Sequence, residues 1–236
     1  VWPTLPTDGP QTVLSRRDPE SGAGFALVLT PDGMALEVGG ARVVVGKPLR
    51  GRIWYRVWAS ADPVTGTLHV GQQPLKRAHA VDDEGEAETV APLPLALEAA
   101  RPVMIGAEQA TDRPAARCFN GKIEAPCIQG FAAWDFTRRM DSMEIEDTGP
   151  NGLHGKLINL PTRAMTGSTW TGAVHDWKAA PEQYGAIHFH DDDISDCKWQ
   201  PTTSWTVPAG TRSGGSCSGK GRKANSAAKR ASESSS

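Results

Sequence analysis

The stretch from Trp54 to Val70, WYRVWASADPVTGTLHV, constrains the fold more than any other part of the chain. Residues 54–60 alternate with the period of two that is typical of a pleated strand. Asp62–Gly66 then supplies turn chemistry, because Asp bonds nearby backbone, Pro fixes φ and Gly accepts a positive φ. Thr67–Val70 begins a return strand. The stretch therefore predicts a β-hairpin, and with it a wide antiparallel sheet.

Short strands separated by turns recur along the first half of the chain. Asp32-Gly33 lies between two apolar runs, which favours a further hairpin. The acidic run Val81–Glu88 is expected to be a solvated loop. Leu93–Ala100 is the one helix-like segment, but Pro94 and the lack of a cap argue against a helix. Strands are expected at Gln11–Ser15, Phe25–Thr30, Met34–Gly39, Val43–Val45, Val103–Gly106 and Cys118–Ile128. Such regularly spaced short strands predict an all-β sandwich or jelly roll.

The second half predicts further strands and then an abrupt change in composition. Strands are expected at Trp134–Phe136, Lys156–Leu160 and Tyr184–His190, with a loop running to Trp177. From Gly214 the sequence lacks apolar periodicity, which predicts a disordered tail. We therefore expect a β-sandwich over residues 1–170, a loop and β connector over 171–212, and a tail over 213–236. The chain has no initiator Met, and its tail begins in mid-pattern. It is therefore expected to be truncated at both ends, with a tail out of its natural reading frame.

The totals exclude several classes of function. The formal net charge is −2, so no global basic field attracts nucleic acid. No run approaches the ~20 apolar residues that span a bilayer. Neither a P-loop nor a G-x-G-x-x-G or G-x-S-x-G motif is present. Cysteine spacing matches no zinc pattern, and reduced cysteines in the cytoplasm are favoured over a Cys118–Cys127 bridge. The four cysteines are Cys118, Cys127, Cys197 and Cys217.

The densest group of ligand-capable side chains follows the strand expected at Tyr184–His190. Two histidines two residues apart project to one face of a strand and are able to hold a metal, and consecutive aspartates supply oxygen ligands. Phe189 between the histidines is expected to face the core, which places both at a surface or interface. A structural or interface role is therefore preferred to metal binding. The candidate residues are His188, His190, Asp191, Asp192 and Asp193, with Asp196 nearby.

Two other groups suggest carbohydrate chemistry. Glu144 and Glu146 lie in an acidic stretch, and paired carboxylates perform glycoside hydrolysis when they face each other. With Ile145 facing inward, however, a solvated strand face is the simpler interpretation. The chain has eight tryptophans, and aromatic rings stack on sugars. Three of them lie in loop-like sequence and are candidates for contact with a ligand or another domain, namely Trp170, Trp177 and Trp199.

Several strings resemble known families. The strings VWPTLP, QTVLSR, GFALVLTPDGMALEVG, WYRVWASADPVTGTLHV, VMIGA and FNGKIE resemble strands of the concanavalin-A-like, laminin-G-like jelly roll. In the second half, GPNGLHG, NLPTRAMTG and YGAIHFHDDD resemble the large subunit of the N,N-dimethylformamidase family. Together these resemblances cover residues 1–212, and the opening Val1-Trp2-Pro3 resembles the end of a strand that begins earlier.

The resemblance implies an accessory role. The family hydrolyses N,N-dimethylformamide to dimethylamine and formate with a mononuclear iron held by two tyrosines and a glutamate, in a separate domain. This chain has two tyrosines, Tyr55 and Tyr184, and Tyr55 matches no ligand motif. No catalytic residue and no cofactor are therefore assigned to the chain. The implied partners are the catalytic domain, the small subunit and further copies in a homo-oligomer. A carbohydrate-binding module and a jelly-roll glycoside hydrolase remain as alternatives.

Overall fold

The computed structural model describes residues 1–76, 81–113, 115–172 and 178–189, which all lie in the compact unit Val1–Asp192. Regular structure in this part consists of β-strands and one short 3₁₀ helix, η1 (Pro181–Tyr184). The predicted all-β class is confirmed. Across the residues described, no helix is both long and apolar enough to cross a bilayer.

One layer is a five-stranded antiparallel sheet in the order β5-β4-β3-β2-β9. The predicted turn at Asp32-Gly33 joins β3 to β4, and Gly33 has a φ of 106°. A Cβ at Gly33 would lie 2.3 Å from the Lys47 carbonyl oxygen, so a side chain does not fit there. The strands are β2 (Gln11–Arg17), β3 (Gly24–Thr30), β4 (Gly33–Val38), β5 (Ala41–Val44) and β9 (Met104–Ile105).

A second layer contains the predicted hairpin, formed by β6 (Tyr55–Ala61) and β7 (Thr67–Pro74). In its turn, the Asp62 carboxylate accepts hydrogen bonds from the Val64 N–H and the Thr65 hydroxyl, both at 2.8 Å. The third strand is β8 (Gly85–Val90), which pairs with β7. Residues 81–84 lie in a loop as expected, but the expectation was wrong for Gly85–Glu88, which belong to β8, because an edge strand tolerates charged residues on its exposed face.

The second layer continues through the start of the chain. The Tyr55 N–H donates to the Val1 carbonyl oxygen at 2.8 Å, so β6 lies beside the chain that enters β1. From β1 the order is β1-β10-β16-β15, all antiparallel. Its strands are β1 (Trp2–Pro3), β10 (Gly121–Glu124), β15 (Thr162–Met165) and β16 (Ala186–Phe189).

β16 confirms the strand expected at Tyr184–His190, and it pairs with both β10 and β15. β15 lies where a loop was expected. The expected strand Cys118–Ile128 is interrupted, because Ala125 has a φ of 44° and ends β10 before β11 begins. Cys118 and Cys127 form no disulfide.

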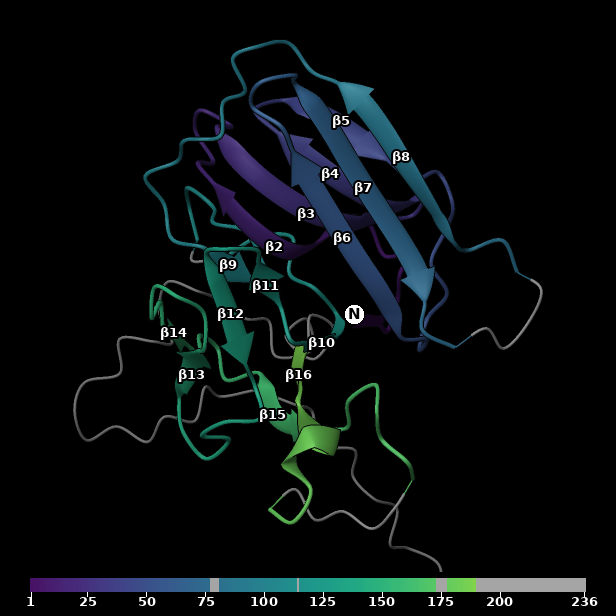
Figure 1. Cartoon of the computed structure of the whole chain (residues 1–236), viewed down its shortest axis with the longest axis vertical. Coiled ribbons are helices and arrows are strands. Elements are labelled where there is room, and N and C mark those ends of the chain that lie inside the picture. The colour runs from purple at the N-terminus through teal and green to yellow at the C-terminus, as the bar shows by residue number, and fades with distance from the viewer. Residues whose placement is uncertain (77–80, 114, 173–177, 190–236) are drawn as a thin grey trace, which may run out of the picture. The chain divides into compact units, whose positions relative to one another are not determined.

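A four-stranded meander, β11-β12-β13-β14, follows β10 (Figure 1). Each strand pairs with the next one along the chain. The strand expected at Lys156–Leu160 is shorter than predicted, because Asn159 and Leu160 have φ values of 62° and 49° and leave the extended conformation. The strands are β11 (Cys127–Ile128), β12 (Ala132–Asp135), β13 (Glu144–Asp147) and β14 (Gly155–Lys156).

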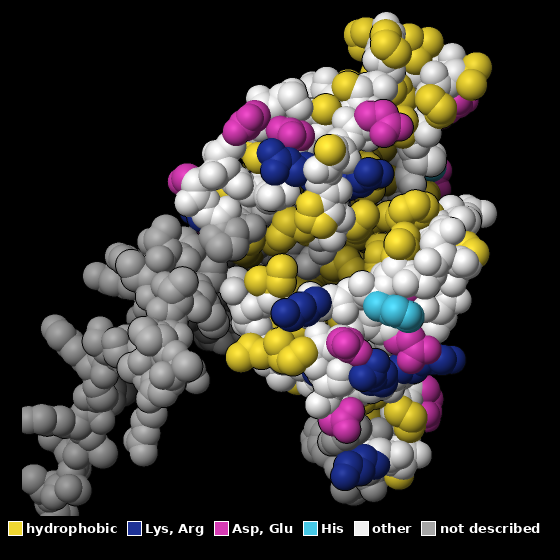
Figure 2. All heavy atoms as spheres, turned by 90° about the vertical axis from the view of Figure 1, so that its left-hand side faces the viewer, with side chains coloured by type: hydrophobic (Ala, Val, Ile, Leu, Met, Phe, Trp, Pro, Cys, Tyr) yellow, Lys and Arg dark blue, Asp and Glu magenta, His cyan; other side chains and the backbone are white. Residues whose placement is uncertain are grey.

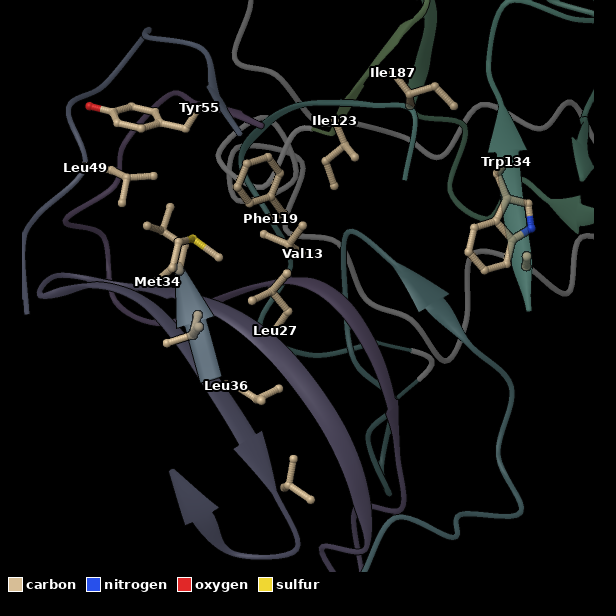
Figure 3. Packing of buried hydrophobic residues seen from close by; sticks show 14 of the residues in the cluster. Val13, Leu27, Met34, Leu36, Leu49, Tyr55, Phe119, Ile123, Trp134 and Ile187 are labelled. Atoms are coloured by element: carbon tan, nitrogen blue, oxygen red, sulfur yellow. The ribbon is translucent and has the colours of Figure 1, made fainter. Parts of the chain in front are cut away.

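The main core lies between the two layers. β4 and β5 pack against β7 and β8 (Figure 1), as the sandwich prediction requires. Phe119 is fully buried and lies beside Val13 of β2 and Ile123 of β10 (Figure 3). It therefore joins the five-stranded sheet to the sheet that contains β10. The same cluster also includes Leu29, Met34, Leu36, Val38, Tyr55, Leu68, Val70 and Ile187.

Candidate functional site

A row of four directly paired residues crosses the sheet β1-β10-β16-β15. Residues paired across strands share one face of a sheet. Ile187, the neighbour of His188 in β16, is 1% exposed and points into the core. Because side chains alternate along a strand, the row lies on the outer face. We call this group the outer row; its members are Trp2, Lys122, His188 and Thr162.

The first three residues of the outer row contact one another. The Trp2 and His188 rings meet edge to face, with centroids 6.3 Å apart and planes at 87°. The Lys122 Nζ lies 4.9 Å from the centre of the Trp2 ring, within cation–π range. It also donates a hydrogen bond to the Thr166 hydroxyl at 2.8 Å. Partial burial lowers the pKa of Lys122 from its ordinary value.

His188 is the member of the predicted histidine–aspartate cluster that the structure places. Phe189 packs against the main core, as predicted from strand parity, so His188 lies on the opposite, partly exposed face. His190, Asp191, Asp192, Asp193 and Asp196 lie outside the described residues. Among the residues that are described, no three His, Cys, Asp or Glu side chains group closely enough to hold a metal ion. Metal binding by the whole cluster stays a prediction.

Of the three candidate contact tryptophans, Trp170 lies in the described part of the chain. It is 38% exposed, and its backbone N–H donates to the Gly167 carbonyl oxygen at 3.3 Å. Contact of Trp170 with a ligand or another domain stays a prediction. Trp177 and Trp199 lie outside the described residues, so a shared aromatic surface stays a prediction.

The two carboxylates considered for glycoside chemistry are held by arginines. Arg138 Nη1 lies 2.7 Å from Glu146 Oε1, and Arg139 pairs with Glu144. Ile145 between them is buried, so both carboxylates project from the same outer face of β13. Two carboxylates side by side on one strand do not flank a glycosidic bond from opposite sides. Their contacts are those of a solvated strand face.

The two tyrosines do not fit an iron site that uses two phenolates. The Tyr55 hydroxyl donates to Asp83 Oδ2 at 2.7 Å and accepts from the Arg50 N–H at 3.1 Å. Burial raises the pKa of Tyr55, so the phenol keeps its proton. Tyr184 is buried in η1. Tyr55 is therefore a structural residue of the core, and the tyrosines of this part of the chain support no reaction step that uses iron.

Sequence reasoning missed Arg163, which holds the loop between β12 and β13. Its guanidinium donates to five backbone carbonyl oxygens at 2.7–3.4 Å. The acceptors are the carbonyls of Phe136, Arg138, Arg139, Ser142 and Glu144. The two Nη groups of the planar guanidinium share four N–H donors among these five acceptors, whereas the buried Nε–H has no partner among the described residues. The sequence gives no signal for this contact, because backbone carbonyls are present in every segment.

Asp147 organises the glycine-rich turn DTGPNGLHG. Its carboxylate accepts hydrogen bonds from the N–H groups of Ala133 and Gly149, both at 2.7 Å, and of Leu153 at 2.6 Å. These donors, that of Ala133 first, hold the pKa of Asp147 below its usual range. The ionised carboxylate is thus a structural centre of the turn.

Replacing Asp147 with asparagine is expected to flatten the acid limb of the stability profile. Because the folded pKa is depressed, the ionised group stabilises the native state above about pH 4, and this contribution is lost as the pH falls through the folded pKa. Urea unfolding from pH 6 to pH 2.5 measures the slope. If the unfolding free energy of Asp147→Asn falls with pH as steeply as that of the native chain, the Asp147 carboxylate is not the source of the pH dependence. Asp8→Asn, on an exposed residue, is the matched control.

Comparison with known proteins gives one relationship. No protein-family profile matches the chain. The N,N-dimethylformamidase beta subunit of Paracoccus aminophilus is 28% identical to this chain over an alignment of 257 positions. The alignment covers 90% of this chain and 34% of that protein. The beta subunit from an Alcaligenes species is 27% identical, with the same coverage.

This chain is distantly related to the dimethylformamidase beta subunit. The predicted resemblance is thereby confirmed. The chain spans about a third of the length of these two relatives, since the matched part covers 34% of each.

Proposed function

We propose that this chain forms an accessory, non-catalytic β-sandwich part of a dimethylformamidase-like amidohydrolase beta subunit. In such an enzyme, N,N-dimethylformamide is hydrolysed to dimethylamine and formate. The observation that carries the proposal is the match of 90% of this chain to about a third of a longer subunit of that name. The proposed partners are the catalytic remainder of that subunit, a small subunit and further copies, in the cytoplasm.

The contacts of the polar side chains support an accessory role. Arg163 and Asp147 are occupied by backbone groups, and the Tyr55 hydroxyl is occupied within the core. Glu144 and Glu146 are paired with arginines. General acid–base chemistry needs a titratable group within hydrogen-bond reach of a substrate. These groups instead hold turns and strands of the protein together.

Exposed apolar side chains offer a contact surface for the proposed partners. Figure 2 shows hydrophobic side chains in a band across the middle of the face that carries β9 and the meander. Around the meander, five large apolar residues are 39–63% exposed: Phe131, Met143, Leu153, Ile158 and Leu160. Groups of exposed apolar residues are typical of surfaces that bind another protein or domain. This surface supports docking against the remainder of a longer subunit.

An activity assay tests the proposal. The purified chain, supplied with ferrous iron and N,N-dimethylformamide, is expected to release no dimethylamine above the buffer rate. The rate should be the same for the native chain and for Glu144→Gln. Dimethylamine release in proportion to the concentration of the native chain would contradict the accessory role. Loss of that release in Glu144→Gln would further locate the chemistry on β13.

A further inference from the structure

The sequence contains the pair Asn-Gly twice, at Asn120-Gly121 and at Asn151-Gly152. In such a pair the glycine nitrogen is able to attack the side-chain amide of the asparagine, because glycine has no Cβ that hinders the approach. The attack is intramolecular, so its rate depends on whether the two groups are free to reach the reactive geometry. The fold places the two pairs in opposite environments.

The first pair is held inside a sheet. Asn120 is 3% exposed, and its backbone N–H donates to Gln11 Oε1 at 2.9 Å. Gly121 begins β10, which is paired with β1 on one side and with β16 on the other. A Cβ built on Gly121 would lie 2.3 Å from the Trp2 carbonyl oxygen, so the peptide has no room to turn. Attack here requires the strands to separate, and strands of a core open only at a large cost in free energy.

The second pair lies in an open turn. Asn151 and Gly152 are both exposed, in the glycine-rich turn between β13 and β14. Gly152 has a φ of 60°. Apart from its chain neighbours, no heavy atom of the described residues lies within 4 Å of the position that a Cβ would take. The turn therefore has space for ring closure and for the water that reopens the ring.

One hydrogen bond of Asn151 joins this turn to a neighbouring one. Its Nδ2 donates to the carbonyl oxygen of Phe131 at 2.8 Å, and Phe131 lies in the turn between β11 and β12. An ionised carboxylate has acceptors only. Conversion of the Asn151 amide to a carboxylate therefore removes this hydrogen bond and introduces a negative charge beside a carbonyl oxygen.

We propose that the fold directs spontaneous deamidation to Asn151 and protects Asn120, with water as the co-reactant. The Gly152 nitrogen forms a bond to Asn151 Cγ and loses its proton, and the side-chain nitrogen leaves as ammonia. Water then opens the cyclic imide at either of its two carbonyls and gives aspartate or isoaspartate. In sum, the amide and one water become a carboxylic acid and ammonia. This inference does not depend on the proposed enzyme relationship.

Peptide mapping of the full chain tests the proposal after incubation in heavy-oxygen water at mildly alkaline pH. Trypsin, applied afterwards in ordinary water, releases Asn151 in Met140–Lys156 and Asn120 in Cys118–Lys122, and each peptide holds one asparagine. In the native chain, label is expected to enter the first peptide at least about tenfold faster than the second, because turns open far more readily than core strands. Asn151→Gln keeps the amide but closes a less favourable six-membered ring. It is the matched control and is expected to leave the first peptide unlabelled.

The same incubation in concentrated urea shows whether the fold causes the difference. Once the chain is unfolded, the two peptides are expected to take up label at similar rates, since both contain an Asn-Gly pair. Absence of label at Asn151 in the native chain would overturn the proposal. A rate ratio that is the same in urea as in the native chain would also overturn it, because the fold would then have no influence on the choice of site.

Discussion

Replacing Arg163 with methionine is expected to lower the free energy of unfolding by about 2–4 kcal/mol. The change removes the donors to five carbonyl oxygens of the loop between β12 and β13. Methionine keeps much of the apolar stem, so the loss reports the guanidinium. The loop is partly exposed, and water replaces some of the lost donors, which keeps the effect below the sum of five hydrogen bonds. Urea unfolding measures the difference.

Two comparison variants show whether geometry or charge is responsible. Arg163→Lys keeps the charge but presents a point donor, so it is expected to recover only part of the loss. Arg139→Met removes an exposed pair with Glu144 and is expected to cost about 0–1 kcal/mol. Equal losses of unfolding free energy in Arg163→Met and Arg139→Met would show that the hydrogen bonds from Arg163 to the five backbone carbonyls stabilise the fold no more than an exposed ion pair does.

Replacing Phe119 with alanine is expected to cost about 3–5 kcal/mol, the largest effect of any single substitution considered. Phe119 is 0% exposed and belongs to the main core cluster. It packs between β2 of one layer and β10 of the other (Figure 3), so neither layer closes the cavity alone. Urea unfolding of the native chain and the variant gives the loss if the slope with urea is unchanged.

The matched control is Val64→Ala in the turn of the β6–β7 hairpin. Val64 is 80% exposed, and its loss is expected to change stability by no more than about 0.5 kcal/mol. A loss below about 1 kcal/mol for Phe119→Ala would mean that the two layers do not share this side chain.

The elements that sequence reasoning predicted correctly carry local signals. The β6–β7 hairpin follows from a period of two and from Asp62, whose carboxylate caps the turn as its residue type indicates. The turn before Gly33 follows from its Asp-Gly pair. The placement of His188 on the outer face follows from the parity of Phe189. Each of these depends on neighbours within a few residues along the chain.

The elements that were missed depend on distant contacts. β8 was hidden by its acidic residues, which an edge strand tolerates. β15 contains Ala164 with a φ of 53°, so it shows no regular alternation. The outer row joins Trp2, Lys122 and His188. Any two of these residues are more than sixty positions apart in the sequence, and strand pairing brings them together.

Buried polar side chains were missed for the same reason. Gln72 is fully buried, and its carbonyl oxygen accepts the Met34 N–H of β4 at 2.8 Å. Its amide nitrogen donates to the Lys47 and Asp83 carbonyl oxygens at 2.7 and 3.0 Å. Because glutamine is mostly exposed in folded proteins, its residue type alone predicts an exposed position in a strand. Its role as a link between the two layers becomes visible only when both layers are in place.

The central claim is that two antiparallel layers pack around one core and that the buried polar side chains stabilise these layers through hydrogen bonds to the backbone. A methyl NOE spectrum of the purified chain tests it most directly. The account predicts NOEs between the methyl groups of β4, at Met34 and Leu36, and those of β7, at Leu68 and Val70, because all four belong to one core cluster. NOEs confined to each hairpin, with none between these strands, would contradict it.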